Sequence, residues 1–328
     1  MPVVTNRAGL LLTLIIIFSS LSCHVYAQPD PEAQRKAALE VPIADAHYHL
    51  IPGLNAQAMK AQMDRNGVRW AGGVGATQPG IEVDSFSLEL GSRYSRAGAQ
   101  AELARIYRTG GVDELQNLNN PIFIALKTAL TDDFKAGKIQ GIGELILNNL
   151  RSHPDPTFRR KVPLDAPPIV ELIAIANQFG GYVQIHTEPD AGSLAQLERL
   201  VVAYPKVAFI LSHCMPLSSA SDMRSLLNKY QTIYCEVSTR NPVYSKNPQH
   251  QASVIHSGRD IDSSWLKLIE EMPGRFMIGS DVHSSTLSYD EIIQVVRGGF
   301  LSQLRPETMR QVAYENAVKV LRLDPAAK

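Results

Sequence analysis

The chain is poor in cysteine and carries no excess charge of either sign. It has three cysteines among its 328 residues, and its 32 basic side chains equal its 32 acidic ones. Three cysteines are too few for a disulfide scaffold. The balanced charge gives no support to binding through a basic surface, so we expect no nucleic-acid partner. The sequence also lacks short internal repeats and low-complexity tracts, and its length suits one large α/β domain.

The long apolar run lies at the N-terminus and is too short to span a membrane comfortably. Arg7 precedes the run AGLLLTLIIIF, and small residues follow it before Gln28. This pattern predicts a secretory signal peptide over residues 1–27, cleaved after Ala27. We therefore expect a periplasmic or secreted protein with no stable membrane span after cleavage. An uncleaved membrane anchor and lipidation at Cys23 are the alternatives.

After a polar lead-in at 28–40, apolar runs of strand length alternate with helical patterns. The expected strands are 42–49, 69–75, 121–127, 139–146, 181–187, 206–213, 231–238 and 275–281. Eight strands separated by helices favour an α/β fold, a (β/α)8 TIM barrel over residues 41–328. An open doubly wound sheet is the alternative.

Three helices are predicted with particular clarity. Leucines recur at helical spacing over 191–204, cap-type serines begin the segment 218–230, and a proline begins the closing helix at 306–323. The irregular stretch 240–262 is too long for a plain connection. Because it follows the seventh strand, we expect it to form an active-site lid.

Side-chain parity separates functional from structural positions on these strands. Cys214 falls on the face opposite His213, which indicates a structural role. Cys214 and Cys235 lie on neighbouring predicted strands at different depths, so we expect two buried thiols rather than a disulfide. On the seventh strand, Glu236 and Ser238 share a face.

Six potential metal ligands stand at the carboxyl ends of predicted strands, where barrel enzymes keep their chemistry. They are His47 and His49 in IADAHYHL, Glu144 in GIGELIL, His186 in VQIHTE, His213 in ILSHCM and Asp281 in MIGSDVH. A single histidine at a strand end is usually a hydrogen-bonded core residue. Four histidines and two acids at one end of one barrel predict a divalent metal centre instead. These ligands suit Zn²⁺ best, with Mn²⁺, Fe²⁺ or Co²⁺ as alternatives.

The order H-x-H, acid, His, His, Asp on strands 1, 4, 5, 6 and 8 resembles the amidohydrolase superfamily of metal-dependent hydrolases. The segments RFMIGSDVH and ENAVKVL resemble most its amidohydrolase-related branch, which also includes decarboxylases. The resemblance implies that His47, His49 and Asp281 bind the more buried metal. It places His186 and His213 on a second metal where one is present.

Glu144 departs from the pattern of many superfamily members. They carry a carboxylated lysine that bridges two metals, whereas a glutamate there resembles the TatD-like deoxyribonuclease branch. The number of bound ions, one or two, therefore stays open. The resemblance gives Asp281 the catalytic role of taking a proton from the activated water and passing it to the leaving group. His213 could alternatively orient the substrate carbonyl.

The expected activity is hydrolysis of an amide, ester, lactone or phosphoester bond in a small-molecule substrate. Arg240 could clamp a carboxylate or phosphate of the substrate, or form a plain ion pair, and His283 could donate to the substrate. The alternatives are a decarboxylase or lyase on the same ligands, a TatD-like nuclease, and a non-catalytic periplasmic metal-binding protein. Neutral charge and export disfavour the nuclease, and the residues specify no oligomeric state.

Overall fold

The computed structural model describes residues 30–153, 155–244 and 254–327. The predicted signal peptide at 1–27, Cys23 included, lies outside the described residues, as does the middle of the predicted lid. Within the described ranges, no helix is long and apolar enough to cross a membrane.

The first three strand positions of the barrel are each divided into two short strands. They are β1 (Ile43–Asp45) with β2 (His49–Leu50), β3 (Val68–Gly72) with β4 (Gly75–Ala76), and β5 (Tyr94–Ser95) with β6 (Ala97–Ala99). The other five are β7 (Gly141–Ile146), β8 (Tyr182–His186), β9 (Ala208–Leu211), β10 (Ile233–Glu236) and β11 (Phe276–Met277). All paired strands are parallel. The pairing orders are β1-β3-β5, β2-β4 and β11-β10-β9-β8-β7-β6.

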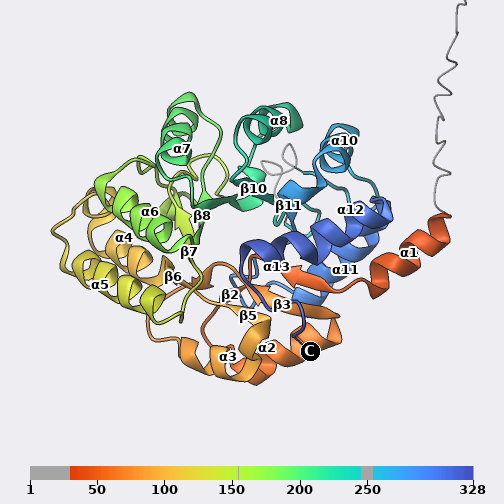
Figure 1. The fold of residues 1–328 in the computed structure, drawn as a ribbon, viewed down its shortest axis with the longest axis horizontal. Helices are drawn as coiled ribbons and strands as arrows, with labels where there is room; N and C mark the ends of the chain where they lie inside the picture. Colours follow the sequence, from red (N-terminus) through yellow and green to blue (C-terminus); the bar gives the residue numbers. More distant parts are fainter. Residues whose placement is uncertain (1–29, 154, 245–253, 328) are drawn as a thin grey trace, which may run out of the picture.

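Backbone hydrogen bonds join the last strand position to the first. Ala46 N donates to Ile278 O at 2.9 Å, and Asp281 N donates to His47 O at 2.8 Å. In the described ranges β11 and β1 are not paired as strands, but these two hydrogen bonds connect the last strand position to the first. Figure 1 shows the helices surrounding the strands. The predicted TIM-barrel fold is confirmed.

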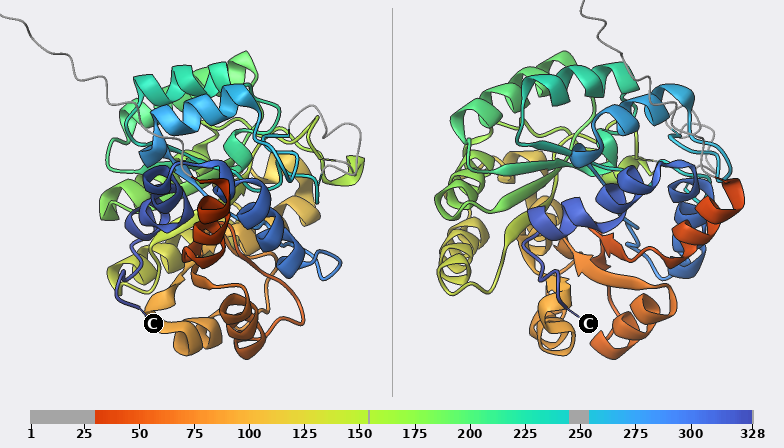
Figure 2. Two further views of the ribbon diagram at one scale, coloured as in Figure 1. Left: turned by 90° about the vertical axis from the view of Figure 1, so that its right-hand side faces the viewer. Right: turned by 45° about the vertical axis from the view of Figure 1, so that its right-hand side comes forward.

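The helices cover the outside of the strands. They are α1 (Pro31–Glu40), α2 (Ala56–Arg65), α3 (Val83–Leu90), α4 (Gln100–Glu114), α5 (Pro121–Lys135), α6 (Pro167–Phe179), α7 (Ala191–Ala203), α8 (Ala220–Lys229), α10 (Ser263–Glu271), α11 (Tyr289–Gly299), α12 (Pro306–Arg310) and α13 (Asn316–Val320). The three clearest helix predictions are confirmed as α7, α8 and the closing α12–α13 pair, which a π-helical turn joins. Helix α1, part of the polar lead-in, packs outside α11 and α12 (Figure 2).

The prediction of a strand at 121–127 is wrong, because this segment begins helix α5. The Asn120 side chain accepts hydrogen bonds from the backbone N–H groups of Ile122 and Phe123, and Pro121 occupies the first turn. The buried residues of α5 recur at helical spacing: Phe123, Leu126, Leu130 and Phe134. The third strand position is formed by β5 and β6, which are too short to give an apolar run in the sequence.

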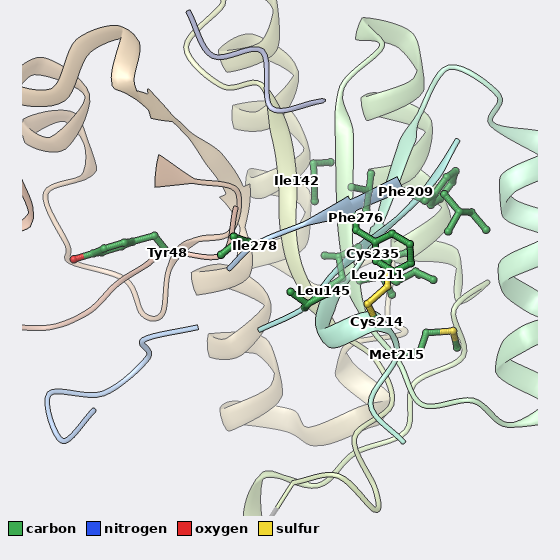
Figure 3. Packing of buried hydrophobic residues seen from close by; sticks show 14 of the residues in the cluster. Tyr48, Ile142, Leu145, Phe209, Leu211, Cys214, Met215, Cys235, Phe276 and Ile278 are labelled. Atoms are coloured by element: carbon green, nitrogen blue, oxygen red, sulfur yellow. A yellow bond between two sulfur atoms is a disulfide. The ribbon is translucent and has the colours of Figure 1, made fainter. Parts of the chain in front are cut away.

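The expectation of two buried thiols is also wrong, because Cys214 and Cys235 form a disulfide (Figure 3). His213, Cys214 and Met215 have φ values of 56°, 50° and 53° directly after β9. This left-handed turn brings the Cα atom of Cys214 to 4.7 Å from that of Cys235, a separation that a disulfide spans. The sulfur atoms lie in the buried core with Leu211.

Candidate metal centre

The first and last strand positions bring three predicted ligands together. His47 Nε2 lies 3.1 Å from His49 Nε2 and 3.3 Å from Asp281 Oδ1, and His49 Nε2 lies 2.9 Å from the same oxygen. All three side chains are buried. They form one group of donor atoms that could hold a metal ion. We call it the first ligand group.

A second ligand group shares His47 with the first. It adds Glu144 from β7 and His213 from the turn after β9. Glu144 Oε2 lies 3.7 Å from His47 Nε2, and Glu144 Oε1 lies 3.5 Å from His213 Nε2. The carboxylate therefore lies within 4 Å of two histidines, one that follows β1 and one that follows β9.

His186, at the end of β8, lies beside the second ligand group. Its Nδ1 is 3.2 Å from Glu144 Oε1, and its ring centroid is 4.8 Å from that of His213. Its side chain is the most exposed of the six predicted ligands, at 13%. The structure thus gathers all six side chains into one cluster, with His186 at its more open edge.

The backbone at this end of the barrel is locally strained. Asp281 has a φ of 52° and His213 a φ of 56°, values that non-glycine residues rarely adopt. Such strain persists where the surroundings enforce it, and it concentrates at functional sites. Part of the enforcement comes from Asp45, whose Oδ1 accepts hydrogen bonds from His47 N at 3.1 Å and from Ser280 N at 2.9 Å. This carboxylate fixes the two turns that carry the first ligand group.

The charges of the cluster are mutually dependent. Burial alone would raise the pKa of the Glu144 carboxyl, but the charge of His47 and hydrogen bonds from histidines hold it well below its usual value. The pKa of Asp281 is likewise held well below its usual value, because His47 and His283 outweigh the effect of burial. Burial lowers the pKa of His47, yet the surrounding carboxylates raise it well above its ordinary value. Removing one member would leave the others uncompensated.

The residues present fit a divalent cation. In the described part of the chain, Glu144 and Asp281 have histidines but no lysine or arginine within ion-pair distance. A cation would supply the missing positive charge. An ion bound at about 2.1 Å in tetrahedral geometry holds its donor atoms roughly 3 to 3.5 Å apart. The donor atoms of the first ligand group, 2.9 to 3.3 Å apart, lie close to that spacing.

Sequence reasoning missed the side chains that form hydrogen bonds with the Nδ1 atoms of the candidate ligand histidines. His47 Nδ1 lies 2.8 Å from Glu236 Oε2, His213 Nδ1 lies 2.7 Å from Ser238 Oγ, and His49 Nδ1 lies 3.2 Å from Gln100 Oε1. The shared strand face of Glu236 and Ser238 was the available signal, because it turns both side chains towards the barrel interior.

The two predicted substrate-binding residues occupy different surroundings. The Arg240 guanidinium is buried, donates to Ser218 O at 2.8 Å and stacks over the Trp265 ring at 4.6 Å. Burial lowers its pKa to about 9. These contacts anchor the loop before α8. The predicted role of Arg240 as a substrate clamp stays a prediction.

His283 lies at the rim of the cluster. Its Nδ1 is 3.4 Å from Asp281 Oδ1, and half of its side chain is exposed. The Asp281 carboxylate raises the pKa of His283 to about 9. From the predicted lid, the Tyr244 hydroxyl reaches the same turn and donates to the carbonyls of Ser280 and Asp281, each at 2.7 Å. The first described part of that stretch therefore packs against the candidate site.

Solved structures with a similar fold include decarboxylases and a hydrolase. A 2,6-dihydroxybenzoate decarboxylase complexed with 2,6-dihydroxybenzoate has a TM-score of 0.52 and 10% identity, covering 87% of this chain and 99% of that one. A probable 2-pyrone-4,6-dicarboxylic acid hydrolase from Acinetobacter baumannii has a TM-score of 0.53 and 13% identity, covering 86% and 99%. A dihydroxybenzoic acid decarboxylase from Polaromonas sp. JS666 with bound manganese has a TM-score of 0.51 and 10% identity, covering 87% and 98%. At these identities the likeness shows a shared fold.

The sequence itself matches a family model. No curated protein matches the chain. The model of the family described as Amidohydrolase matches residues 143–323, which are 181 of the 328 residues and so more than half of the chain. The matched segment contains Glu144, His186, His213 and Asp281. It begins after the H-x-H pair, but the fold places that pair beside these four residues. The predicted resemblance is confirmed: the chain belongs to the amidohydrolase family.

Proposed function

We propose that the chain is an exported metal-dependent hydrolase that cleaves an amide, ester, lactone or phosphoester bond in a small molecule. The observation that carries the proposal is the pair of buried ligand groups that share His47. Both groups stand at the carboxyl ends of the strands, the end at which TIM-barrel enzymes bind their substrates.

Each of the two ligand groups would bind one ion. His47, His49 and Asp281 would hold one divalent ion. Glu144 and His213, with His186 beside them, would hold a second, and zinc suits this donor set best. An ion bound here supplies Lewis acidity towards a substrate oxygen and activates a water molecule.

Asp281 is suited to move the proton that hydrolysis releases. Its Oδ1 faces His47 and His49, while its Oδ2 lies 3.9 Å from His213 Nε2. Because its pKa is held well below the usual value, the carboxylate is ionised at neutral pH and carries no proton before the reaction. It would take the proton of the attacking water and deliver it to the leaving group.

The test combines metal analysis with a substrate screen. The purified mature protein is analysed for bound metal by mass spectrometry and assayed on lactone, ester, N-acyl and phosphoester substrates, with the Asp281→Asn variant as the matched control. Two ions together with hydrolysis support the proposal. One ion together with release of carbon dioxide from aromatic carboxylic acids would favour a decarboxylase, and a metal-free, inactive protein would refute both.

Export is part of the same proposal. The charged start, short apolar run and small residues before Gln28 support it. The Cys214–Cys235 disulfide supports it too, because disulfides persist in oxidising compartments. N-terminal sequencing of the purified protein should begin at Gln28, and a chain that still begins at Met1 would contradict cleavage. Absence of the protein from the periplasm and the medium would contradict export.

A further inference from the structure

We infer that Glu236 is a positioning residue that orients one histidine from each ligand group, His47 and His213, for metal binding. The inference rests on the proposed metal-dependent function. Glu236 is the last residue of β10 and is completely buried. Within the described ranges its carboxylate has no lysine or arginine in ion-pair distance, and the imidazole nitrogens within 4 Å of it belong to the two histidines.

The first contact fixes His47. Glu236 Oε2 lies 2.8 Å from His47 Nδ1 and accepts its proton. In the neutral ring, the form that binds a cation, the lone pair is then on Nε2, the atom that faces His49 and Asp281. Gln184 also lies 2.8 Å from His47 Nδ1, and its Oε1 has no hydrogen-bond partner in the described structure. With its amide turned so that this oxygen faces the ring, Gln184 would accept the same proton.

The second contact fixes His213 through a serine. The Ser238 hydroxyl donates to Glu236 Oε2 at 2.8 Å. Its proton is committed to the carboxylate, so its oxygen accepts from His213 Nδ1 at 2.7 Å. His213 therefore also presents the lone pair of Nε2, the atom that lies 3.5 Å from Glu144. One carboxylate thus selects the same tautomer in two histidines.

The backbone around Glu236 is shaped to hold the carboxylate in place. The backbone N–H of Ser238 donates to Oε1, and that of His213 donates to Oε2 at 3.4 Å. On the other side, a Cβ atom at Gly279 would overlap Glu236 Oε1 and His47 Cβ. A glycine at this position leaves room for the carboxylate against β11. The Glu236 side chain is therefore surrounded by residues from its own strand position and from three others, the first, the sixth and the eighth.

The consequence concerns metal affinity. A histidine binds a cation through an unprotonated nitrogen, and a carboxylate behind the ring both selects that nitrogen and makes it more basic. Because Glu236 serves both ligand groups, its loss should weaken both ions together. Loss of Ser238 should weaken only the ion at His213. This pattern separates a positioning role from a merely structural one.

The experiment measures zinc affinity and stoichiometry by competition with a chromogenic chelator, using the purified mature chain and its Glu236→Gln and Ser238→Ala variants. We expect Glu236→Gln to weaken the binding of every ion by about 10- to 100-fold. Ser238→Ala should weaken one of two ions by roughly tenfold and leave the other unchanged. Glu270→Gln is the control, because Glu270 accepts from Arg305 and Thr308 far from the ligands and should leave the affinity unchanged.

Circular dichroism and thermal unfolding establish that each variant is folded. A folded Glu236→Gln variant with the affinity of the wild type overturns the positioning role and leaves the proposed function standing. If Glu236→Gln does not fold, Ser238→Ala decides, and wild-type affinity for both ions overturns the inference. A wild-type protein that binds none of zinc, manganese, iron and cobalt refutes the proposed function, and the inference falls with it.

Discussion

Asp281 Oδ1 lies 2.9 Å from His49 Nε2, although 232 residues separate the two in the chain. The contact exists because the barrel brings its last strand beside its first. It places an ionised carboxylate among the candidate ligand atoms, and the proposed proton transfer would begin at this carboxylate.

The Asp281→Asn variant should therefore lose turnover and still bind metal. The amide keeps the shape and one oxygen of the carboxylate but cannot accept the proton, so we expect kcat to fall by at least about 100-fold. Steady-state kinetics and metal analysis of the same preparation provide the measurement. An unchanged kcat would exclude Asp281 as the proton acceptor.

Replacing both histidines of the H-x-H pair should remove the metal itself. His47 belongs to both ligand groups and His49 to the first, so a variant with His47→Ala and His49→Ala loses ligands from every candidate site. We expect less than one ion per chain by mass spectrometry. His153→Ala is the matched control, because His153 Nδ1 contacts the backbone of Asp155 and belongs to neither group. Full retention of metal in the double variant would refute the ligand assignment.

The Cys214–Cys235 disulfide should contribute to stability. It closes a loop of 21 residues, and a loop of this length restricts the unfolded chain enough to contribute about 3 kcal/mol to the free energy of unfolding. The variant with Cys214→Ser and Cys235→Ser should unfold at lower urea concentration than the oxidised wild type. Adding a reductant should bring the wild type towards the variant and leave the variant unchanged. Equal midpoints for variant and oxidised wild type would contradict the stabilising role.

The sequence predicted the barrel and the gathering of the six side chains at one end of it because both depend on local patterns. Alternating strands and helices indicated the fold, and the ligands stand at or near the ends of apolar runs, as His186 ends β8. The strand at 121–127 was mispredicted because an apolar run of that length suits a buried helix as well as a strand. Asn120 and Pro121 carried the helix-start signal that decides between them.

The groups behind the ligands were harder to predict because their pairing depends on how neighbouring strands are arranged. Parity placed Glu236 and Ser238 on one face, but nothing local shows which histidine each one meets. The disulfide was missed for a similar reason. It depends on three successive residues with positive φ after β9, and none of His213, Cys214 and Met215 is a glycine, the residue that would have signalled such a turn.

His256 should make the folded protein sensitive to acid. It is buried against Phe300, with ring centroids 5.4 Å apart, and its Nδ1 has no hydrogen-bond partner in the described structure. Burial lowers its pKa to about 4. In the unfolded chain the pKa of a histidine is about 6.5. Protonation therefore favours the unfolded chain, and stability is lost as pH falls from 6.5 towards 4.

The difference of roughly 2.5 pH units corresponds to about 3 kcal/mol of unfolding free energy. The His256→Gln variant keeps a polar side chain of similar size but binds no proton. We expect its unfolding free energy to fall less than that of the wild type between pH 7 and pH 4.5. Urea unfolding of both proteins in the same chelating buffer isolates this effect, because the ligand histidines titrate alike in each. Parallel pH profiles would show that His256 is not the residue responsible.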